Sequence, residues 1–91
     1  MASNIADLLP RIGELKRKVI QILPHVREDI NRIISNRVQS TSEIERVLDT
    51  LLDYLPLGIG EQEFKLLNGY YATLNRQNAE IYDSYRRRGS S

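Results

Sequence analysis

The amino-acid sequence predicts an all-α fold: a small antiparallel up-and-down helical bundle of four helices, or of three with the first kinked at Pro24. Apolar residues recur at intervals of three and four along most of the chain, which is the period of helices that bury one face. The only strand-like apolar run, Leu55–Ile59, contains a proline and a glycine. The length of 91 residues fits one domain, expected over 1–88 and followed by a flexible tail over 89–91.

The first helical segment is expected to begin after Asn4, which has the side chain of an N-cap residue. Pro24 lies far from both ends of this segment and lacks the amide hydrogen that an internal helical bond requires. The sequence therefore predicts a break or a strong kink at Pro24. The apolar stripe keeps its phase across the proline, which favours a kink or a tight corner. The stripe comprises Ile5, Leu8, Ile12, Leu15, Val19, Ile22, Val26, Ile30 and Ile33.

A polar turn over 36–42 is expected to lead into a second apolar-striped helix, from about Thr41 to Leu55. Ser40 and Glu43 have the spacing of a capping box, as do Ser42 and Glu45. The helix is expected to end before Pro56, because the residue that precedes a proline is restricted to extended conformations. Residues 56–60 then form the connection to the next helix.

The last helix is expected to be long and unbroken over 61–88, with Arg86, Arg87 and Arg88 at its negative end. At about 1.5 Å per residue it would be roughly 42 Å long and would outrun the preceding helix by two or three turns. A heptad seam runs along it, with one strongly polar member. The seam comprises Phe64, Leu67, Tyr71, Leu74, Asn78, Ile81 and Tyr85.

The apolar stripes together predict a core drawn from every helix. Its expected members are Leu8, Ile12, Leu15, Val19, Ile22, Val26, Ile30, Ile33, Ile44, Val47, Leu48, Leu51, Phe64, Leu67, Tyr71 and Leu74. The overhanging end of the last helix would then expose an apolar and tyrosine-rich stripe that another helix could cover. We expect Asn78, Ile81, Tyr82 and Tyr85 to form this partner-binding surface.

The composition excludes several kinds of chemistry. The chain has no cysteine, which excludes disulfide scaffolds, cysteine zinc sites and thiol catalysis, and favours a cytoplasmic location. Its one histidine, His25, lies a turn from Glu28, but a zinc site needs three or four ligands. No run of about 18 apolar residues is present, so no transmembrane segment is expected. We therefore expect a non-enzymatic chain that uses no cofactor or metal.

These features favour a protein–protein interaction or assembly module, bound to a protein partner or to itself as a homo-oligomer. The alternative is a small nucleic-acid-associated regulatory protein that contacts phosphates through two basic clusters. These clusters are Lys16, Arg17 and Lys18, and Arg86, Arg87 and Arg88. The net charge of +1 and the acidic residues over 39–85 oppose a broad phosphate footprint. The amphipathic segment 5–23 also suits a membrane surface, but a bundle core requires the same stripe.

Overall fold

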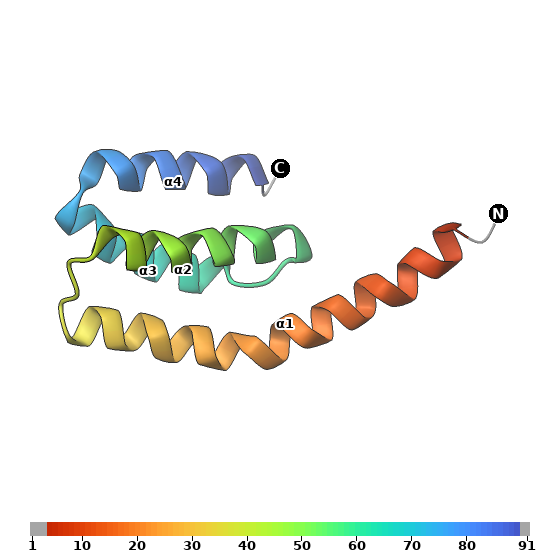
Figure 1. The fold of residues 1–91 in the computed structure, drawn as a ribbon. Coiled ribbons are helices and arrows are strands. Elements are labelled where there is room, and N and C mark those ends of the chain that lie inside the picture. Colours follow the sequence, from red (N-terminus) through yellow and green to blue (C-terminus); the bar gives the residue numbers. More distant parts are fainter. Residues whose placement is uncertain (1–3, 90–91) are drawn as a thin grey trace.

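The structure is a computed structural model that describes residues 4–89, with side chains described over 13–88. It contains α1 (Asn4–Ser35), α2 (Thr41–Tyr54), the short 3-10 helix η1 (Leu55–Leu57), α3 (Glu61–Leu74) and α4 (Arg76–Gly89). Residues 4–89 form no strand, so the predicted all-α bundle is confirmed. The pair α2 and α3 lies between α1 and α4, and the N-terminal half of α1 projects beyond the bundle (Figure 1).

The core lies where α1, α2 and α3 meet, and α4 covers it from the side opposite α1. Most of the predicted core residues of the described part are buried, but Leu15, Ile22 and Leu74 are exposed and were wrongly assigned to the core. Leu8 and Ile12 lie outside the residues whose side chains are described. The largest fully buried side chains are Tyr71, Phe64, Ile30, Ile33, Ile44, Leu48, Leu51 and Leu67.

The prediction of one long C-terminal helix over 61–88 is wrong, because the helix ends at Leu74 and a second one begins at Arg76. Asn75 connects them with an extended backbone (φ −151°, ψ 86°). Its side-chain Oδ1 accepts a hydrogen bond from the amide of Asn78 at 3.1 Å, which caps the new helix. The chain then reverses, α4 packs antiparallel on α3, and the predicted overhang of the last helix does not exist.

Pro24 does not break the first helix, which continues from Asn4 to Ser35. Figure 1 shows α1 changing direction near the middle of its length. The proline removes the bond to the carbonyl of Ile20 and crowds that carbonyl, and a helix accommodates both effects by bending. Pro24 itself is exposed, so its ring displaces no core residue. The bundle therefore has four helices because the chain turns at Asn75.

Short local signals set the connections between the helices. The amide of Glu43 donates to Oγ of Ser40 at 3.3 Å, which confirms Ser40 as the N-cap of α2. After η1, Gly58 and Gly60 adopt φ values of 76° and 90°, a region that glycine enters without a steric cost. Gly89 is the last residue of α4, and the other two residues of the expected tail, 90 and 91, lie outside the described part.

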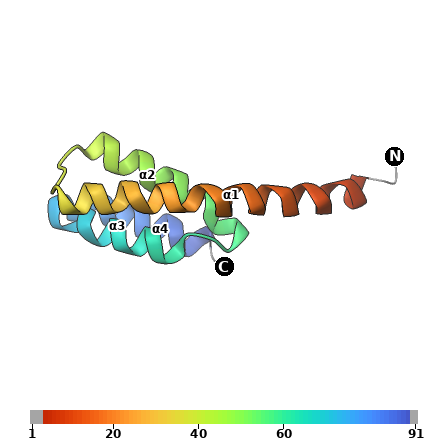
Figure 2. The ribbon, with the colours of Figure 1, turned by 90° about the horizontal axis from the view of Figure 1, so that it is seen from below.

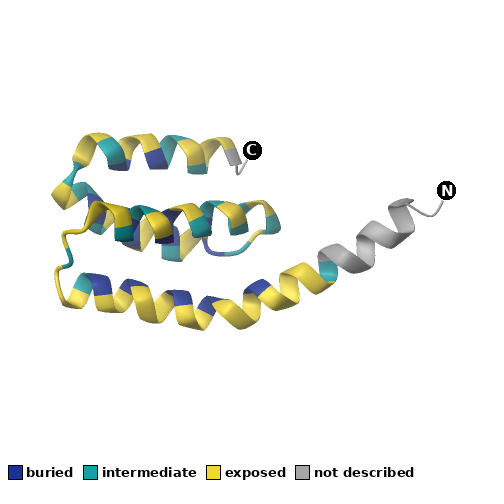
Figure 3. Ribbon diagram, viewed as in Figure 1, coloured by how far each residue is buried: buried dark blue, intermediate teal, exposed yellow. Residues whose placement is uncertain are grey.

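The N-terminal part of α1, residues 4–22, makes little contact with the rest of the described chain, and we call it the projecting half. Leu23 is the first residue of α1 in the main core cluster, although Val19 is also buried. Figure 3 shows that the described residues of the projecting half are mostly exposed, whereas one face of the C-terminal half is buried at regular intervals. Seen from below, α1 also extends well past the other helices (Figure 2). The unequal helix length expected for the C-terminal helix is therefore found in α1.

Candidate interaction surfaces

A polar seam joins α4 to α2, which lie parallel and in register. The hydroxyl of Tyr82 donates to Oδ1 of Asp49 at 2.8 Å. One turn earlier on both helices, Nδ2 of Asn78 donates to Oε2 of Glu45 at 3.4 Å. The Tyr71 hydroxyl of α3 also donates to Glu45, and lies 3.2 Å from Nδ2 of Asn78. Two carboxylates thus accept hydrogen bonds from groups that point inward from α3 and α4.

The seam keeps both phenols protonated. Burial raises the pKa of Tyr71 above the ordinary tyrosine value of 10.0, and the hydrogen bond to Glu45 raises it further. Burial followed by the hydrogen bond to Asp49 raises the pKa of Tyr82 more strongly. A neutral phenol that donates to a carboxylate is neither a nucleophile nor a base at neutral pH. The seam therefore holds α4 against α2 through hydrogen bonds from neutral side chains to carboxylates.

The seam divides the predicted partner-binding residues into two pairs. Asn78 and Tyr82 hydrogen-bond to α2, and Tyr82 is only 9% exposed, so its side chain is covered by the chain itself. Ile81 and Tyr85 remain 45% and 48% exposed. A shallow pocket of about 280 Å³ lies beside them, lined also by Glu45. Only the outer half of the stripe is available to a partner.

The C-terminal arginine cluster is engaged with acidic residues. Arg86 contacts Glu61 at 3.2 Å and Asp83 at 2.9 Å, and these contacts tie the end of α4 to the start of α3. Arg87 lies 3.6 Å from the same Asp83. The predicted phosphate contacts at Arg86 and Arg87 would therefore compete with carboxylates. In the other cluster, Lys16, Arg17 and Lys18 are all exposed on the projecting half of α1.

The described residues provide no group of three or more His, Cys, Asp or Glu side chains that could hold a metal ion. His25 is exposed on α1. Among the helices described here, none has the length and apolar character needed to cross a membrane.

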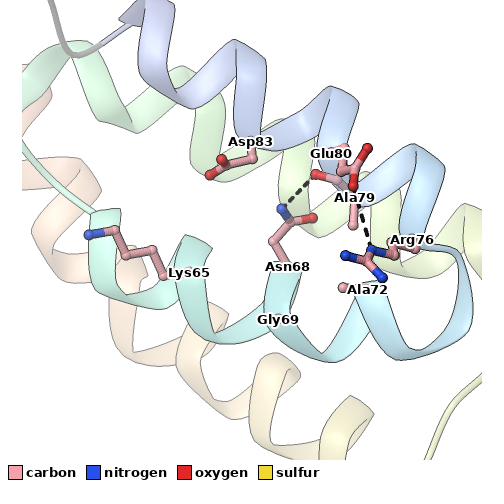
Figure 4. Close-up of a pocket in the computed structure, with 8 residues that line it drawn as sticks. All are labelled: Lys65, Asn68, Gly69, Ala72, Arg76, Ala79, Glu80 and Asp83. Carbon is pink, nitrogen blue, oxygen red and sulfur yellow. Dashed lines mark hydrogen bonds and ion pairs between the residues drawn. The ribbon is translucent and has the colours of Figure 1, made fainter.

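A second pocket of about 280 Å³ lies between α3 and α4 (Figure 4). Its floor is made of small residues, Gly69, Ala72 and Ala79, which allow the two helices to approach closely. Asn68 is buried at its edge and donates from Nδ2 to the carbonyl of Ala79 at 2.9 Å. Its Oδ1 is buried without a hydrogen-bond partner. Asn68 was not predicted from the sequence, because its burial depends on α4 packing against α3, which the helical spacing did not predict.

The projecting half of α1 exposes the continuation of the helix face that builds the core. Leu15 and Ile22 are 49% and 46% exposed, and they are two helical turns apart on the same face. Val19, between them, is buried. Ile20, at 56% exposed, adds apolar surface on an adjacent side of the helix. Three of the seven large apolar side chains that are exposed in the described part of the chain therefore lie on this segment.

Comparison with protein-family models, with curated proteins and with solved structures gave no match. The assignment of a function therefore depends on the geometry alone.

Proposed function

We propose that the chain is a non-enzymatic protein-association module, and that the projecting half of α1 is the segment through which it associates. The supporting observation is that one helix face is core along the bundle and exposed beyond it. Val26, Ile30 and Ile33 are at most 7% exposed, whereas Leu15 on the same face is about half exposed. An amphipathic helix gains most of its stability by covering such a face.

The exposed pair on α4 is a second and smaller contact in this proposal. Ile81 and Tyr85 are one turn apart, and the ring of Tyr85 packs edge-on against Tyr82 with 6.0 Å between centroids. The hydrogen bond from the Tyr82 hydroxyl to Asp49 holds this ring in place. An aromatic and an aliphatic side chain on a rigid base are typical of the centre of a protein interface. The proposal therefore retains Ile81 and Tyr85 as partner-contacting residues.

Site-specific photocrosslinking tests the proposal in the cells that produce the protein. A benzophenone amino acid is placed at Leu15, on the uncovered face, and in a matched variant at Arg17. Arg17 is exposed and lies two residues later, which places it on nearly the opposite side of the helix. We expect a discrete protein adduct from position 15 and little from position 17. Absence of an adduct at 15, or equal yields at the two positions, would contradict the proposal.

Two further measurements distinguish this proposal from nucleic-acid binding. If Lys16, Arg17 and Lys18 bound phosphates, affinity for mixed DNA and RNA would fall steeply as salt is raised. The proposal predicts no retention on nucleic acid at moderate salt. It also predicts that the adduct at position 15 survives nuclease treatment. An adduct that disappears with nuclease would instead favour the nucleic-acid alternative.

A further inference from the structure

We infer that the chain forms a domain-swapped dimer, in which α3 and α4 straighten into one helix and α4 packs on the bundle of a second copy. In such a dimer each copy receives from its partner the element that it gives up, so the contacts inside the bundle are kept. The inference goes beyond the proposed function, because it concerns α3 and α4 and makes no use of the projecting half of α1. It depends on the joint between these helices, on the register of their contacts and on Leu74.

The joint between α3 and α4 is a single residue, Asn75. Residues 70–88 contain neither glycine nor proline, the two residues that disfavour a helix most strongly. In the hairpin, the amide of Asn78 donates to the side chain of Asn75. In a continuous helix the same amide would donate to the carbonyl of Leu74, four residues earlier. A change of backbone conformation at the joint therefore converts the hairpin into one helix, and short hinges of this kind favour domain swapping.

The contacts between α3 and α4 have the register of two long helices paired antiparallel. Glu61 at the start of α3 lies 3.2 Å from Arg86 near the end of α4. Closer to the joint, Asn68 donates to the carbonyl of Ala79 (Figure 4). Both pairs are centred between residues 73 and 74, so a two-fold axis at that point brings the same residues together from two straightened helices. Each copy then holds the α4 of the other through the contacts that held its own.

The polar seam on α2 is kept in the same way. In the swapped dimer, Asp49 accepts its hydrogen bond from Tyr82 of the second copy, which takes the place of its own Tyr82 in the hairpin. Glu45 likewise accepts from Asn78 of the second copy. The hairpin and the swapped dimer therefore share the interior of the bundle and differ at the joint.

Leu74 gives the dimer a contact that the hairpin lacks. It lies three residues after Tyr71, whose ring packs against Tyr82 of α4, so it belongs to the face of α3 that is turned toward α4. Its side chain is nevertheless 38% exposed. In the dimer it lies beside the two-fold axis, where Leu74 of the second copy meets it. The swapped form therefore covers an apolar side chain that the hairpin leaves in contact with water.

Crosslinking of a double-cysteine variant distinguishes the swapped dimer from any other dimer, because the chain has no cysteine of its own. Glu61→Cys combined with Arg86→Cys marks the contact between α3 and α4. In the hairpin the two positions meet within one chain, but along a straightened helix they are 25 residues, or roughly 37 Å, apart. After size exclusion, a short bismaleimide should link two chains in the dimer fraction and should link within one chain in the monomer fraction. A denaturing gel shows which link has formed.

Arg27→Cys combined with Glu63→Cys provides the matched control. These side chains join α1 to α3 at 2.7 Å, and neither helix is exchanged in the swapped dimer. The control should therefore link within one chain in both fractions. A dimer held together by any other surface would give this result for the pair at positions 61 and 86 as well.

Two variants at the joint should shift the balance between monomer and dimer in opposite directions. Asn75→Ala removes the capping bond of the hairpin and favours a continuous helix, so the share of dimer should rise several-fold at a given concentration. Two glycines inserted after Asn75 lengthen the joint and disfavour the helix, so this variant should be monomeric. A wild-type chain without dimer at the highest concentration reached, a dimer whose 61–86 link stays within one chain, or the opposite order of the two variants overturns the inference.

Discussion

Tyr82 on α4 donates its hydroxyl hydrogen to Asp49 on α2 at 2.8 Å, and Asn78 and Glu45 repeat the contact one turn earlier on the same two helices. The two contacts share a separation of 33 residues, so α2 and α4 run parallel with a fixed register. This seam binds the last helix to the bundle. It also withdraws Asn78 and Tyr82 from the surface that the sequence pattern suggested.

Alkaline pH is expected to destabilise the protein through the seam. The pKa values of Tyr71 and Tyr82 are raised above 10.0 by burial and by their carboxylate partners, so the folded state holds these protons more tightly than the unfolded state. Their stabilisation is complete below pH ~10 and is lost as the pH rises above that value. Urea unfolding at several pH values between about 9 and 11.5 measures how steeply the free energy of unfolding falls with pH.

In the Tyr82→Phe variant, the free energy of unfolding should fall less steeply at alkaline pH. Tyr54→Phe serves as the matched control. Tyr54 is partly buried but lies outside the seam. The Tyr82 variant should also be less stable at neutral pH, because Asp49 loses the hydrogen bond from its hydroxyl, by about 1 kcal/mol. If the free energy of unfolding falls equally steeply with pH in both variants, the hydroxyl of Tyr82 does not contribute to the alkaline destabilisation.

Asn75→Ala should destabilise the protein by about 1 kcal/mol, the usual cost of removing an N-cap side chain. The substitution deletes the acceptor for the Asn78 amide, which lies 3.1 Å from Oδ1 of Asn75. Gln77→Ala, an exposed change within the first turn of the same helix, provides the control. Chemical denaturation of both variants measures the difference. A loss no larger for Asn75→Ala than for Gln77→Ala would contradict the capping role.

Ile81→Asp should leave the fold intact, because Ile81 is 45% exposed on α4. A surface substitution of this kind typically changes the free energy of unfolding by no more than about 0.5 kcal/mol. Ala79→Asp, two residues earlier and 3% exposed, should instead unfold the protein, because it buries a charge between α3 and α4. Circular dichroism with thermal melting distinguishes them. Unfolding of the Ile81 variant would place that side chain in the core.

Gly60→Ala should be more destabilising than Gly58→Ala, although both glycines have positive φ angles. The left-handed conformation alone costs a non-glycine residue about 1–2 kcal/mol. A Cβ at Gly60 would also lie 3.1 Å from Cδ2 of Leu51, whereas a Cβ at Gly58 would meet no atom of a neighbouring residue within 4 Å. Denaturant midpoints of the two variants give the comparison. If both variants lose the same free energy of unfolding, Leu51 moves aside without destabilising the protein.

The sequence predicted the helical period, most of the core and the start of α2, because these depend on spacing and on local capping. Ser40 caps α2 as its position relative to Glu43 suggested. The helix break at Asn75 was not predictable from the heptad seam. A seam of threes and fours has the same pattern whether one long helix faces a partner or two short helices face each other. The signal that distinguishes them is the capping bond from Asn75 to the Asn78 amide, which periodicity does not record.

The sequence pattern predicted exposed apolar helix surface, but it did not predict that α1 would carry much of it. Sequence analysis expected apolar helix length that the chain itself cannot cover, and placed it at the C-terminus. Pro24 was expected to break or strongly kink the first helix, and only a break would have shortened it; α1 bends and stays continuous (Figure 1). Whether a proline breaks or bends a helix depends on the packing around it. The uncovered apolar face therefore lies at Leu15 and Ile22 rather than at Asn78 and Tyr82.

Amide hydrogen exchange of the purified chain tests most directly the central claim that the bundle leaves the projecting half of α1 uncovered, because it reports separately on the two halves of this helix. Residues 14–22 should exchange much faster than residues 26–33, which the bundle buries on one face. Exchange over 14–22 that is as slow as exchange over 26–33 would show that the chain covers this face itself, and would contradict the claim.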